Sequence, residues 1–453
     1  MKDNFLKNSF FLTLSNLTTG FLMFIFIIIL SKELGPEGMG LYAIIMPIYD
    51  LFICLICGGM VIAISSSTAI YLSKKDYPNL NKLIKTSLFF DLFWGLFIAI
   101  LVFIASPFIA KYILKDSRAL KSIMIICPAM LFVALSSILK GYFYGIKKIA
   151  TPAIIDICEK AIRVIIILSL LYSLKYVEIK NTVFSAYLAL TIGEAISFLL
   201  LYINYKKSKK IYFQRGTSES SLQILFNTLR ISYPLCLNGF LTTILAATSS
   251  ILMPRRLIIA GYTYQTSLAL IGKFKSMSLN ITNFPIIIII SVSIVLIPDL
   301  SKTIANKDYY LVQKRIKEVL FLAFFIGIIS SIFCFIFSNN LGFLFYKRND
   351  LGNFIRFTSI TSPFTFLSVT TYAILNGVGK QKLVLKHSLI TSVIELILIY
   401  FLTAIPKINV YSYGYTIIIT SCISIFINFK ALYKNKILTH SFNKTIWNKR
   451  YYS

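Results

Sequence analysis

Residues 75–85 read KDYPNLNKLIK and residues 307–317 read KDYYLVQKRIK, so six of eleven positions are identical at an offset of 232 residues. The same offset relates Gly145 to Gly377. Matches that recur at one offset indicate an internal repeat, in which each copy is one supersecondary unit. The sequence therefore predicts two halves with the same architecture.

The composition identifies the environment of these halves. Of the 453 residues, 57% are hydrophobic and 14% are charged, and the mean hydropathy is +0.78. Soluble domains average about 45–50% apolar and about 25% charged residues, and disordered chains have low hydrophobicity. The net charge of +29 is spread along the chain rather than gathered in one polar domain, which argues against a nucleic-acid partner. The remaining class is an integral membrane protein.

Twelve apolar runs have the length of about 20 residues that a spanning helix needs. They lie near 9–30, 41–64, 86–110, 122–139, 153–174, 182–204, 226–252, 277–298, 318–338, 354–375, 387–405 and 411–433. A further half-span is possible at 254–276. The predicted fold is all-α and polytopic, with two six-helix lobes. Because six is even, both lobes have the same orientation in the membrane.

Domain limits and topology follow from the loops between these runs. We expect an N-terminal lobe at 1–215, a C-terminal lobe at 216–435 and a basic cytoplasmic tail at 436–453. With the N-terminus inside, and with Arg356 and Lys430 at span ends counted with the adjoining loops, the inner segments carry 28 Lys and Arg and the outer segments carry 15, while Lys160, Arg163 and Arg230 lie within spans. Cytoplasmic loops are enriched in Lys and Arg. The sequence thus predicts a multi-pass protein of the cell membrane with both termini in the cytoplasm.

Repeated six-helix halves are common in transporters, which bind substrate between the halves near the middle of the bilayer. Ionisable groups inside spans are costly there and usually face a partner or a cavity. Glu159 and Arg163 are four residues apart on one helix face, which makes an ion pair available. That pair is either a structural clamp or part of a cavity wall, and Lys160 lies beside it.

Further intramembrane carboxylates are candidates for ion coupling or charge pairing. They are Asp50, Asp156, Glu194 and Glu395. Glu395 is equivalent to Arg163 at the offset of 232, so we hypothesise that the two pair across the central interface. Asp91 lies beside Trp94 near the start of a predicted span, where a position at the membrane surface is expected.

A basic cluster follows the seventh run on the predicted outer side, where positive charge is not expected. It contains Arg255, Arg256, Lys273 and Lys275. Arginine suits bidentate recognition of phosphate oxygens, so Arg255, Arg256 and Lys273, together with Arg163, Lys160 and Glu159, are candidates for a substrate cavity. The alternative for residues 254–276 is a solvated loop.

Nothing in the sequence predicts a metal site, a cofactor or catalysis. The seven Cys lie in apolar runs, and His387 and His440 cannot form a metal site alone. No GxxxxGK[ST] motif for ATP is present. A membrane enzyme would need a cluster of Asp, Glu or His in an aqueous loop, and the predicted loops are short and rich in Lys.

Several motifs resemble those of one family. They are LGPEGMGLY at 34–42, KGYFYG at 140–145, PRRL at 254–257, LIPDLS at 296–301 and NGVG at 376–379. In this order they are similar to the polysaccharide-flippase family that includes stage V sporulation protein B, from about residue 5 to residue 435. The chain departs from that family around Ile27, where members often carry an Arg, and in its twelve rather than fourteen predicted helices.

The resemblance implies the MATE-like fold of the multidrug/oligosaccharidyl-lipid/polysaccharide (MOP) exporters. It further implies alternating-access translocation of an undecaprenyl-pyrophosphate-linked saccharide, such as a peptidoglycan precursor for the spore cortex. The implied partners are this lipid-linked saccharide, membrane lipids, and a proton or monovalent cation. Two alternatives stay open: a cation-coupled multidrug exporter of the same superfamily, and a non-transporting scaffold of a cell-wall or sporulation complex.

Overall fold

Helices make up nearly all of the computed structural model, which describes residues 2–173, 179–209 and 219–434. The first half contains α1 (Lys2–Cys57), α2 (Met60–Ser73), α3 (Tyr77–Phe108), η1 (Ile109–Leu114), η2 (Ser117–Ala119), α4 (Leu120–Gly145), α5 (Ala150–Ser173) and α6 (Ile179–Lys209). The second half contains α7 (Ser221–Ile259), α8 (Tyr264–Ile271), η4 (Gly272–Ser278), α9 (Leu279–Asn283), α10 (Ile286–Ala305), α11 (Tyr309–Ile336), α12 (Ser338–Tyr346), α13 (Gly352–Gly377), α14 (Gln381–Leu402), η5 (Asn409–Tyr411) and α15 (Ser412–Lys434). No strand occurs in the described residues.

The predicted internal repeat is confirmed by the backbone of the turns. Residues with positive φ recur in pairs 232 residues apart: Lys75 and Lys307, Lys115 and Lys347, Lys147 and Gly379. After the first pair, Asp76 caps α3 by accepting a hydrogen bond from the Asn79 amide at 3.1 Å. Asp308 caps α11 in the same way, from the Leu311 amide at 3.0 Å. An N-cap side chain fixes where a helix begins, so both halves start their third span at equivalent residues.

The apolar helices account for the twelve expected spans. Eight of the described helices are long and apolar enough to cross a bilayer. One of them, Thr13–Ser73, is 61 residues long and holds two spans, because its backbone is non-helical at Gly35 (φ 62°) and helix resumes at Pro36. The bent pair Tyr264–Asn283 and Ile286–Ser301 passes the same test when the two helices are taken together as one broken span. The more polar helices α5 and α13 pack beside these and complete the set.

Two expected spans have different limits in the structure. The predicted run 41–64 crosses the break between α1 and α2, where Gly59 is left-handed with φ 76°. The predicted run 277–298 begins too late, because helix starts at Tyr264 and bends by 58° near Pro285. Residues 264–276 are therefore helical and continuous with the predicted run, so the solvated loop is wrong for them.

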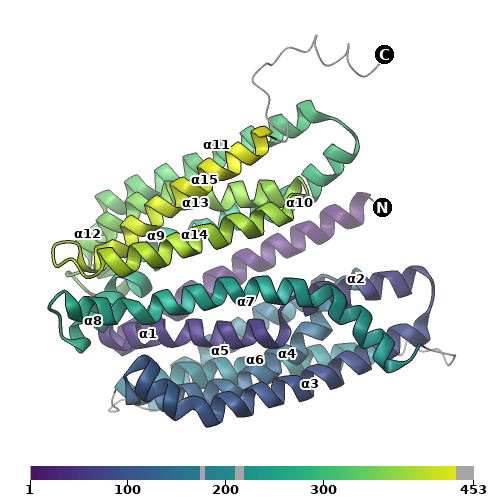
Figure 1. Cartoon of the computed structure of the whole chain (residues 1–453), viewed down its shortest axis with the longest axis horizontal. Coiled ribbons are helices and arrows are strands. Elements are labelled where there is room, and N and C mark those ends of the chain that lie inside the picture. Colours follow the sequence, from purple (N-terminus) through teal and green to yellow (C-terminus); the bar gives the residue numbers. More distant parts are fainter. Residues whose placement is uncertain (1, 174–178, 210–218, 435–453) are drawn as a thin grey trace.

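Figure 1 shows that α1 begins and α15 ends at the same end of the molecule, which we call the terminal end. The other end is called the opposite end. Helices α2 to α6 lie on one side and α10 to α15 on the other (Figure 1). Helix α1 packs against α5 and α10, and α7 packs against α2 and α14, so these two helices touch both sides. The interface between the halves therefore runs along α1 and α7.

The outer faces of α3 and α11 are suited to lipid. Phe93 and Phe325, again 232 residues apart, are both more than half exposed, and other large apolar side chains surround them. Apolar surface of this extent on a soluble monomer would mark a binding site or cause aggregation. In a bilayer it faces hydrocarbon. The predicted boundary near residue 215 and the predicted tail at 436–453 fall outside the described residues and stay predictions.

Candidate functional site

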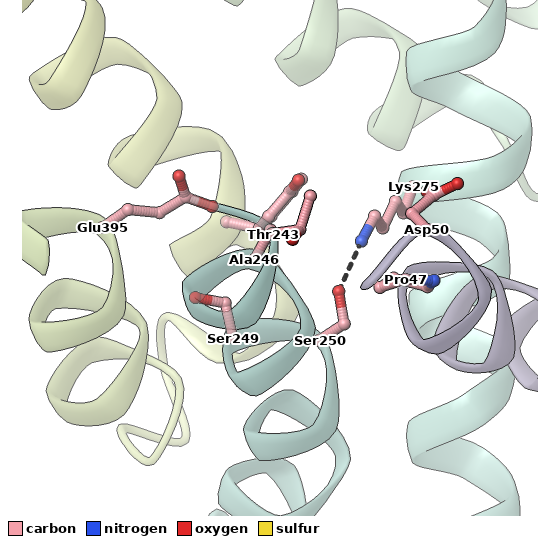
Figure 2. Close-up of a pocket in the computed structure, with 9 residues that line it drawn as sticks. Pro47, Asp50, Thr243, Ala246, Ser249, Ser250, Lys275 and Glu395 are labelled. Atoms are coloured by element: carbon pink, nitrogen blue, oxygen red, sulfur yellow. Dashed lines mark hydrogen bonds between the residues drawn. The ribbon is translucent and has the colours of Figure 1, made fainter. Parts of the chain in front are cut away.

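A cavity of about 130 Å³ lies where the two halves meet. Its lining comes from α1, α7, η4, α14 and α15, and the residues are Pro47, Asp50, Thr243, Ala246, Ser249, Ser250, Lys275, Glu395 and Tyr413. Figure 2 shows Asp50 and Lys275 on one side of α7 and Glu395 on the other. We call this the central cavity. Ligand sites of membrane transporters are expected at this kind of interface.

Lys275 is the cation of the central cavity. Its Nζ donates a hydrogen bond to Ser250 Oγ at 2.9 Å, drawn as a dashed line in Figure 2, and lies 5.4 Å from the centroid of the Tyr413 ring. Among the described residues no carboxylate lies within ion-pair distance of it. The ammonium group thus has donor capacity left for a ligand, since lysine carries three N–H donors.

Two carboxylates share the cavity with this lysine. Asp50 comes from α1 in the first half and Glu395 from α14 in the second, and both act electrostatically on Lys275. The structure describes no hydrogen bond or ion pair for either group. Both groups, predicted as intramembrane coupling or pairing candidates, therefore line the central cavity. Their role in ion coupling stays a prediction.

The predicted pairing of Arg163 with Glu395 is wrong. Arg163 Nε donates to Glu159 Oε1 at 2.9 Å, and Nη2 donates to Glu194 Oε1 at 3.1 Å. Glu159 and Arg163 are 2% and 3% exposed. Lys160 completes what we call the Arg163 cluster through an ion pair with Glu159. The i,i+4 pair is confirmed, and of the two roles considered the structure favours a clamp between α5 and α6.

Asp156 also has a cationic partner, although it lies outside both the central cavity and the Arg163 cluster. Lys140 on α4 forms an ion pair with it at 2.7 Å, and both side chains are partly exposed. This pair joins the end of α4 to the start of α5 near the terminal end. Among the intramembrane carboxylates predicted as coupling candidates, Asp156 and Glu194 therefore have cationic partners, whereas Asp50 and Glu395 do not.

The arginines predicted for the cavity lie elsewhere. Arg255, near the end of α7, donates to the backbone carbonyls of Tyr112 (3.2 Å) and Ile113 in η1 of the first half. Arg256 donates to the Tyr400 carbonyl at 2.7 Å and stacks on that ring at 4.0 Å. Neither lines the central cavity. The expectation that they form it is wrong, because the helix carries them past it to the opposite end.

Lys273 is displaced from the cavity in the same direction. It pairs with Asp350 at 2.8 Å, in the turn between α12 and α13, and the Arg348 guanidinium binds the same carboxylate. These two cations hold the pKa of the Asp350 carboxyl below its usual value, with the Arg348 hydrogen bond as the largest cause. Lys273 therefore belongs to a polar network at the opposite end.

The halves are in close contact at that end. A methyl group on Gly40 would overlap the Leu268 carbonyl, and one on Gly272 would overlap the Pro36 carbonyl. The absence of side chains at these glycines lets α1 approach α8 and η4. Together with the Arg255 contact to η1, this packing closes the opposite end of the interface.

The sequence predicts Lys273 as a cavity residue, whereas the structure has Lys275 there. Lys273 and Lys275 are two residues apart in a segment that was expected to be a loop or half-span. Once the segment is helical, residues i and i+2 do not share a face. One lysine then points to the end of the bundle and the other into the cavity. The hydroxyls of Thr243, Ser249 and Ser250 had no sequence signal, because such residues are common in membrane helices.

Comparison with known proteins assigns the family. The model of the family described as "Polysaccharide biosynthesis protein" matches residues 5–304, and the MatE model matches residues 234–401. Stage V sporulation protein B of Bacillus subtilis is 24% identical over 90% of this chain and 80% of its own length. The Lipid II flippase MurJ of the same organism is 24% identical over 88% of this chain and 77% of its own length.

A solved structure shows the same fold. An inward-facing multidrug resistance MATE family transporter of the MOP superfamily superposes with a TM-score of 0.72, at 16% identity, over 94% of each chain. The predicted MATE-like fold is thereby confirmed. The first family model alone covers well over half of the sequence. The chain belongs to the polysaccharide biosynthesis protein family and has the fold of a MOP superfamily transporter.

Proposed function

We propose that the protein is a flippase that moves a saccharide linked to a polyprenyl diphosphate across the cytoplasmic membrane. The observation that carries the proposal is Lys275, a cation between the two halves whose one hydrogen bond among the described residues is to the Ser250 hydroxyl. The saccharide is a peptidoglycan precursor, such as one for the spore cortex. Supporting this choice, matched relatives are named for sporulation and for lipid II.

The central cavity has the donors that a diphosphate needs. Lys275 supplies charge, and Ser249 and Ser250 on α7 supply hydroxyl donors, whereas the Thr243 hydroxyl already donates to the Gly239 carbonyl. Hydrogen bonds from charged donors to phosphate oxygens are among the strongest in proteins. A volume of about 130 Å³ suits part of a headgroup rather than a whole lipid-linked saccharide. The cavity would thus hold the diphosphate while the sugar lies further along the interface and the polyprenyl tail stays in the bilayer.

Alternating access follows from the closed opposite end. With the terminal end in the cytoplasm, as the loop charges favour, a state closed at the opposite end would take up the headgroup from inside. Opening requires separation of Gly40 from Leu268 and release of Arg255 from η1. Asp50 on one half and Glu395 on the other compete with the headgroup for Lys275. This competition would promote release once the outer side opens.

The energy source is the ion gradient, the membrane potential or consumption of the product, since the sequence has no ATP-binding motif. Moving one charge through 100 mV is worth about 2.3 kcal/mol. An anionic headgroup that leaves a negative interior gains this energy. Both termini would be cytoplasmic in this arrangement.

A cation-coupled multidrug exporter is the second candidate, and one observation favours it. Asp50, Glu395 and the Tyr413 ring line the cavity together, and carboxylates with aromatic rings bind organic cations. The cavity carries two acids against one base, so its charge alone does not select an anion. The two candidates differ in the sign of the ligand charge.

The deciding experiment uses proteoliposomes with a fluorescent polyprenyl diphosphate saccharide and a membrane-impermeant quencher. We expect label to reach both leaflets at a rate above that of protein-free vesicles. A fluorescent lipophilic cation is tested in parallel with an imposed proton or sodium gradient. Uphill movement of the cation, with an unchanged leaflet distribution of the diphosphate, would reject the flippase in favour of the exporter. No movement of either would support the scaffold.

A further inference from the structure

A carboxyl group without a partner is buried inside the first half. Asp91 is 0% exposed, and neither of its oxygens has a hydrogen-bond partner among the described residues. The sequence predicts a position at the membrane surface for Asp91, whereas the structure buries it between helices on α3, which begins at Tyr77 rather than near residue 86. At 1.5 Å per residue, Asp91 is about 20 Å along the helix from Tyr77 and about 9 Å beyond the exposed Lys85, so neighbouring helices, rather than depth in the bilayer alone, shield it from water.

The surroundings of Asp91 are largely apolar. One turn further along α3, the face at Gly95 meets Leu131, Ile56 and Ala134. One turn earlier, Ser87 is also fully buried, and its hydroxyl has no described partner. An ionised carboxylate in such a place is strongly disfavoured, and the usual outcome is that the group becomes neutral.

This face of α3 packs on the break between α1 and α2. Trp94 Nε1, three residues after Asp91, donates to the Leu55 carbonyl at 3.3 Å. That carbonyl lies just before Gly58 and Gly59, where the chain leaves the helix and Gly59 takes φ 76°. Broken helices in transporters commonly bind ions through such regions. Asp91 is therefore positioned to respond to, and to influence, the bend of the second span.

The titratable groups around Asp91 are few. Helices α1, α2, α4 and α7 pack against α3. From α1, the Cys57 thiol is in electrostatic contact with Asp91. No charged group of α2, α4 or α7 among the described residues interacts with it. A metal ion would need several oxygen ligands, which these apolar neighbours do not supply, whereas a proton needs none.

We propose that Asp91 is a proton-binding site, occupied in the state with the opposite end closed. Loss of the proton creates a buried anion that must gain water or a new partner. Water reaches it most directly if α3 separates from the break at Gly58 and Gly59, so the proton and the bend of the second span are coupled. If the proposed flippase function holds, the proton bound here is the coupling ion. The proton site itself does not depend on that function.

The test is infrared difference spectroscopy of the full-length protein in lipid, titrated with pH. We expect a carbonyl stretching band of a protonated carboxyl that persists at neutral pH, shifts on aspartate isotope labelling and disappears in Asp91→Asn. The control is Asp299→Asn, because Asp299 is partly exposed and paired with Arg315. That variant should retain the band. A band that persists in Asp91→Asn, or no protonated aspartate at neutral pH, overturns the proposal.

Three further measurements keep the outcomes distinct. Asp91→Leu should fold with an unchanged or higher melting temperature, because an apolar residue fits an apolar site. If neither variant folds, an isotope-shifted band that persists in Asp50→Asn decides, because Asp50 is the other described aspartate of the spans without an ion pair. A spectrum that responds to sodium at fixed pH, rather than to pH, overturns the proton in favour of a sodium site. Failure of lipid translocation with the band intact rejects the flippase and leaves the proton site standing.

Discussion

Two buried charge sets of similar composition differ in how their cation is held. In the Arg163 cluster, the guanidinium binds both Glu159 and Glu194, at 2.9 Å and 3.1 Å. In the central cavity, Lys275 lies between Asp50 and Glu395 but donates to the Ser250 hydroxyl. The repeat places Arg163 and Glu395 at equivalent positions. Divergence of the two halves has thus made one position part of a clamp and the other part of a cavity wall.

The difference indicates which charges are structural and which are available to a ligand. When one partner of a buried ion pair is removed, the other charge is left buried and uncompensated, and the fold is destabilised. Burial of a cation whose N–H donors are unused costs free energy, and a bound anion can offset this cost. The predictions below test this contrast, starting with the largest expected effect.

Removal of the clamp cation should be the most damaging change to stability. Arg163→Met leaves Glu159 and Glu194 buried without their partner, and we expect a loss of about 3–5 kcal/mol. Thermal unfolding in detergent measures it. Translocation per folded molecule should change little. The combination Glu159→Gln, Arg163→Met and Glu194→Gln should recover most of the melting temperature. A single variant as stable as the wild type would show that the cluster is not a clamp.

Removal of a cavity carboxylate should strengthen binding of the diphosphate, in contrast to the loss of stability expected for Arg163→Met. Asp50→Asn or Glu395→Gln removes a negative charge near the proposed diphosphate site. At an effective dielectric of 20 and separations of about 10 Å, one charge is worth roughly 1–2 kcal/mol, or about five- to thirtyfold in affinity. We expect tighter binding of a polyprenyl diphosphate analogue, measured by competition with a fluorescent lipid. Weaker binding in both variants would favour the cation exporter.

Much of this architecture could be predicted from the sequence, because hydropathy and the 232-residue repeat report lipid exposure and duplication directly. The segment 254–276 was misassigned for a related reason. Its Arg and Lys residues lower the hydropathy of helices that face protein rather than lipid. Arg163 was paired wrongly with Glu395, since equivalence under a repeat does not imply contact. The pairing of Arg163 with Glu194 depends on how α5 packs on α6, which sequence spacing cannot supply.

The contact between Arg255 and η1, which helps to close the opposite end, offers a conformational test of intermediate size. Arg255→Gln removes the hydrogen bonds to the Tyr112 and Ile113 carbonyls. Hydrogen bonds from charged groups contribute about 1.5–3 kcal/mol, so the closed state should become about ten- to a hundredfold less favoured. Spin labels on both sides of the opposite end report this as a longer distance. Arg256→Gln, which removes contacts within the second half, is the control and should leave the distance unchanged.

The smallest expected effect is a pH dependence in the turn that holds Asp350. Lys273 and Arg348 lower the pKa of this carboxyl, so its stabilising contribution is present above the unfolded value of 3.8 and is lost as pH falls below it. The side chain is 40% exposed, and solvent screening limits the contribution to about 0.2–1 kcal/mol. Asp350→Asn should flatten the decline of melting temperature below about pH 4. An unchanged decline would exclude this group as a cause.

The central claim is that Lys275 binds the headgroup, and two lysines two residues apart test it. Lys275→Gln removes a charged donor in the cavity, worth about 1.5–3 kcal/mol. Its rate of diphosphate-lipid translocation per folded molecule should fall about ten- to a hundredfold. Lys273→Gln removes the same charge outside the cavity and should retain the wild-type rate. Equal rates for Lys275→Gln and the wild type would contradict the account.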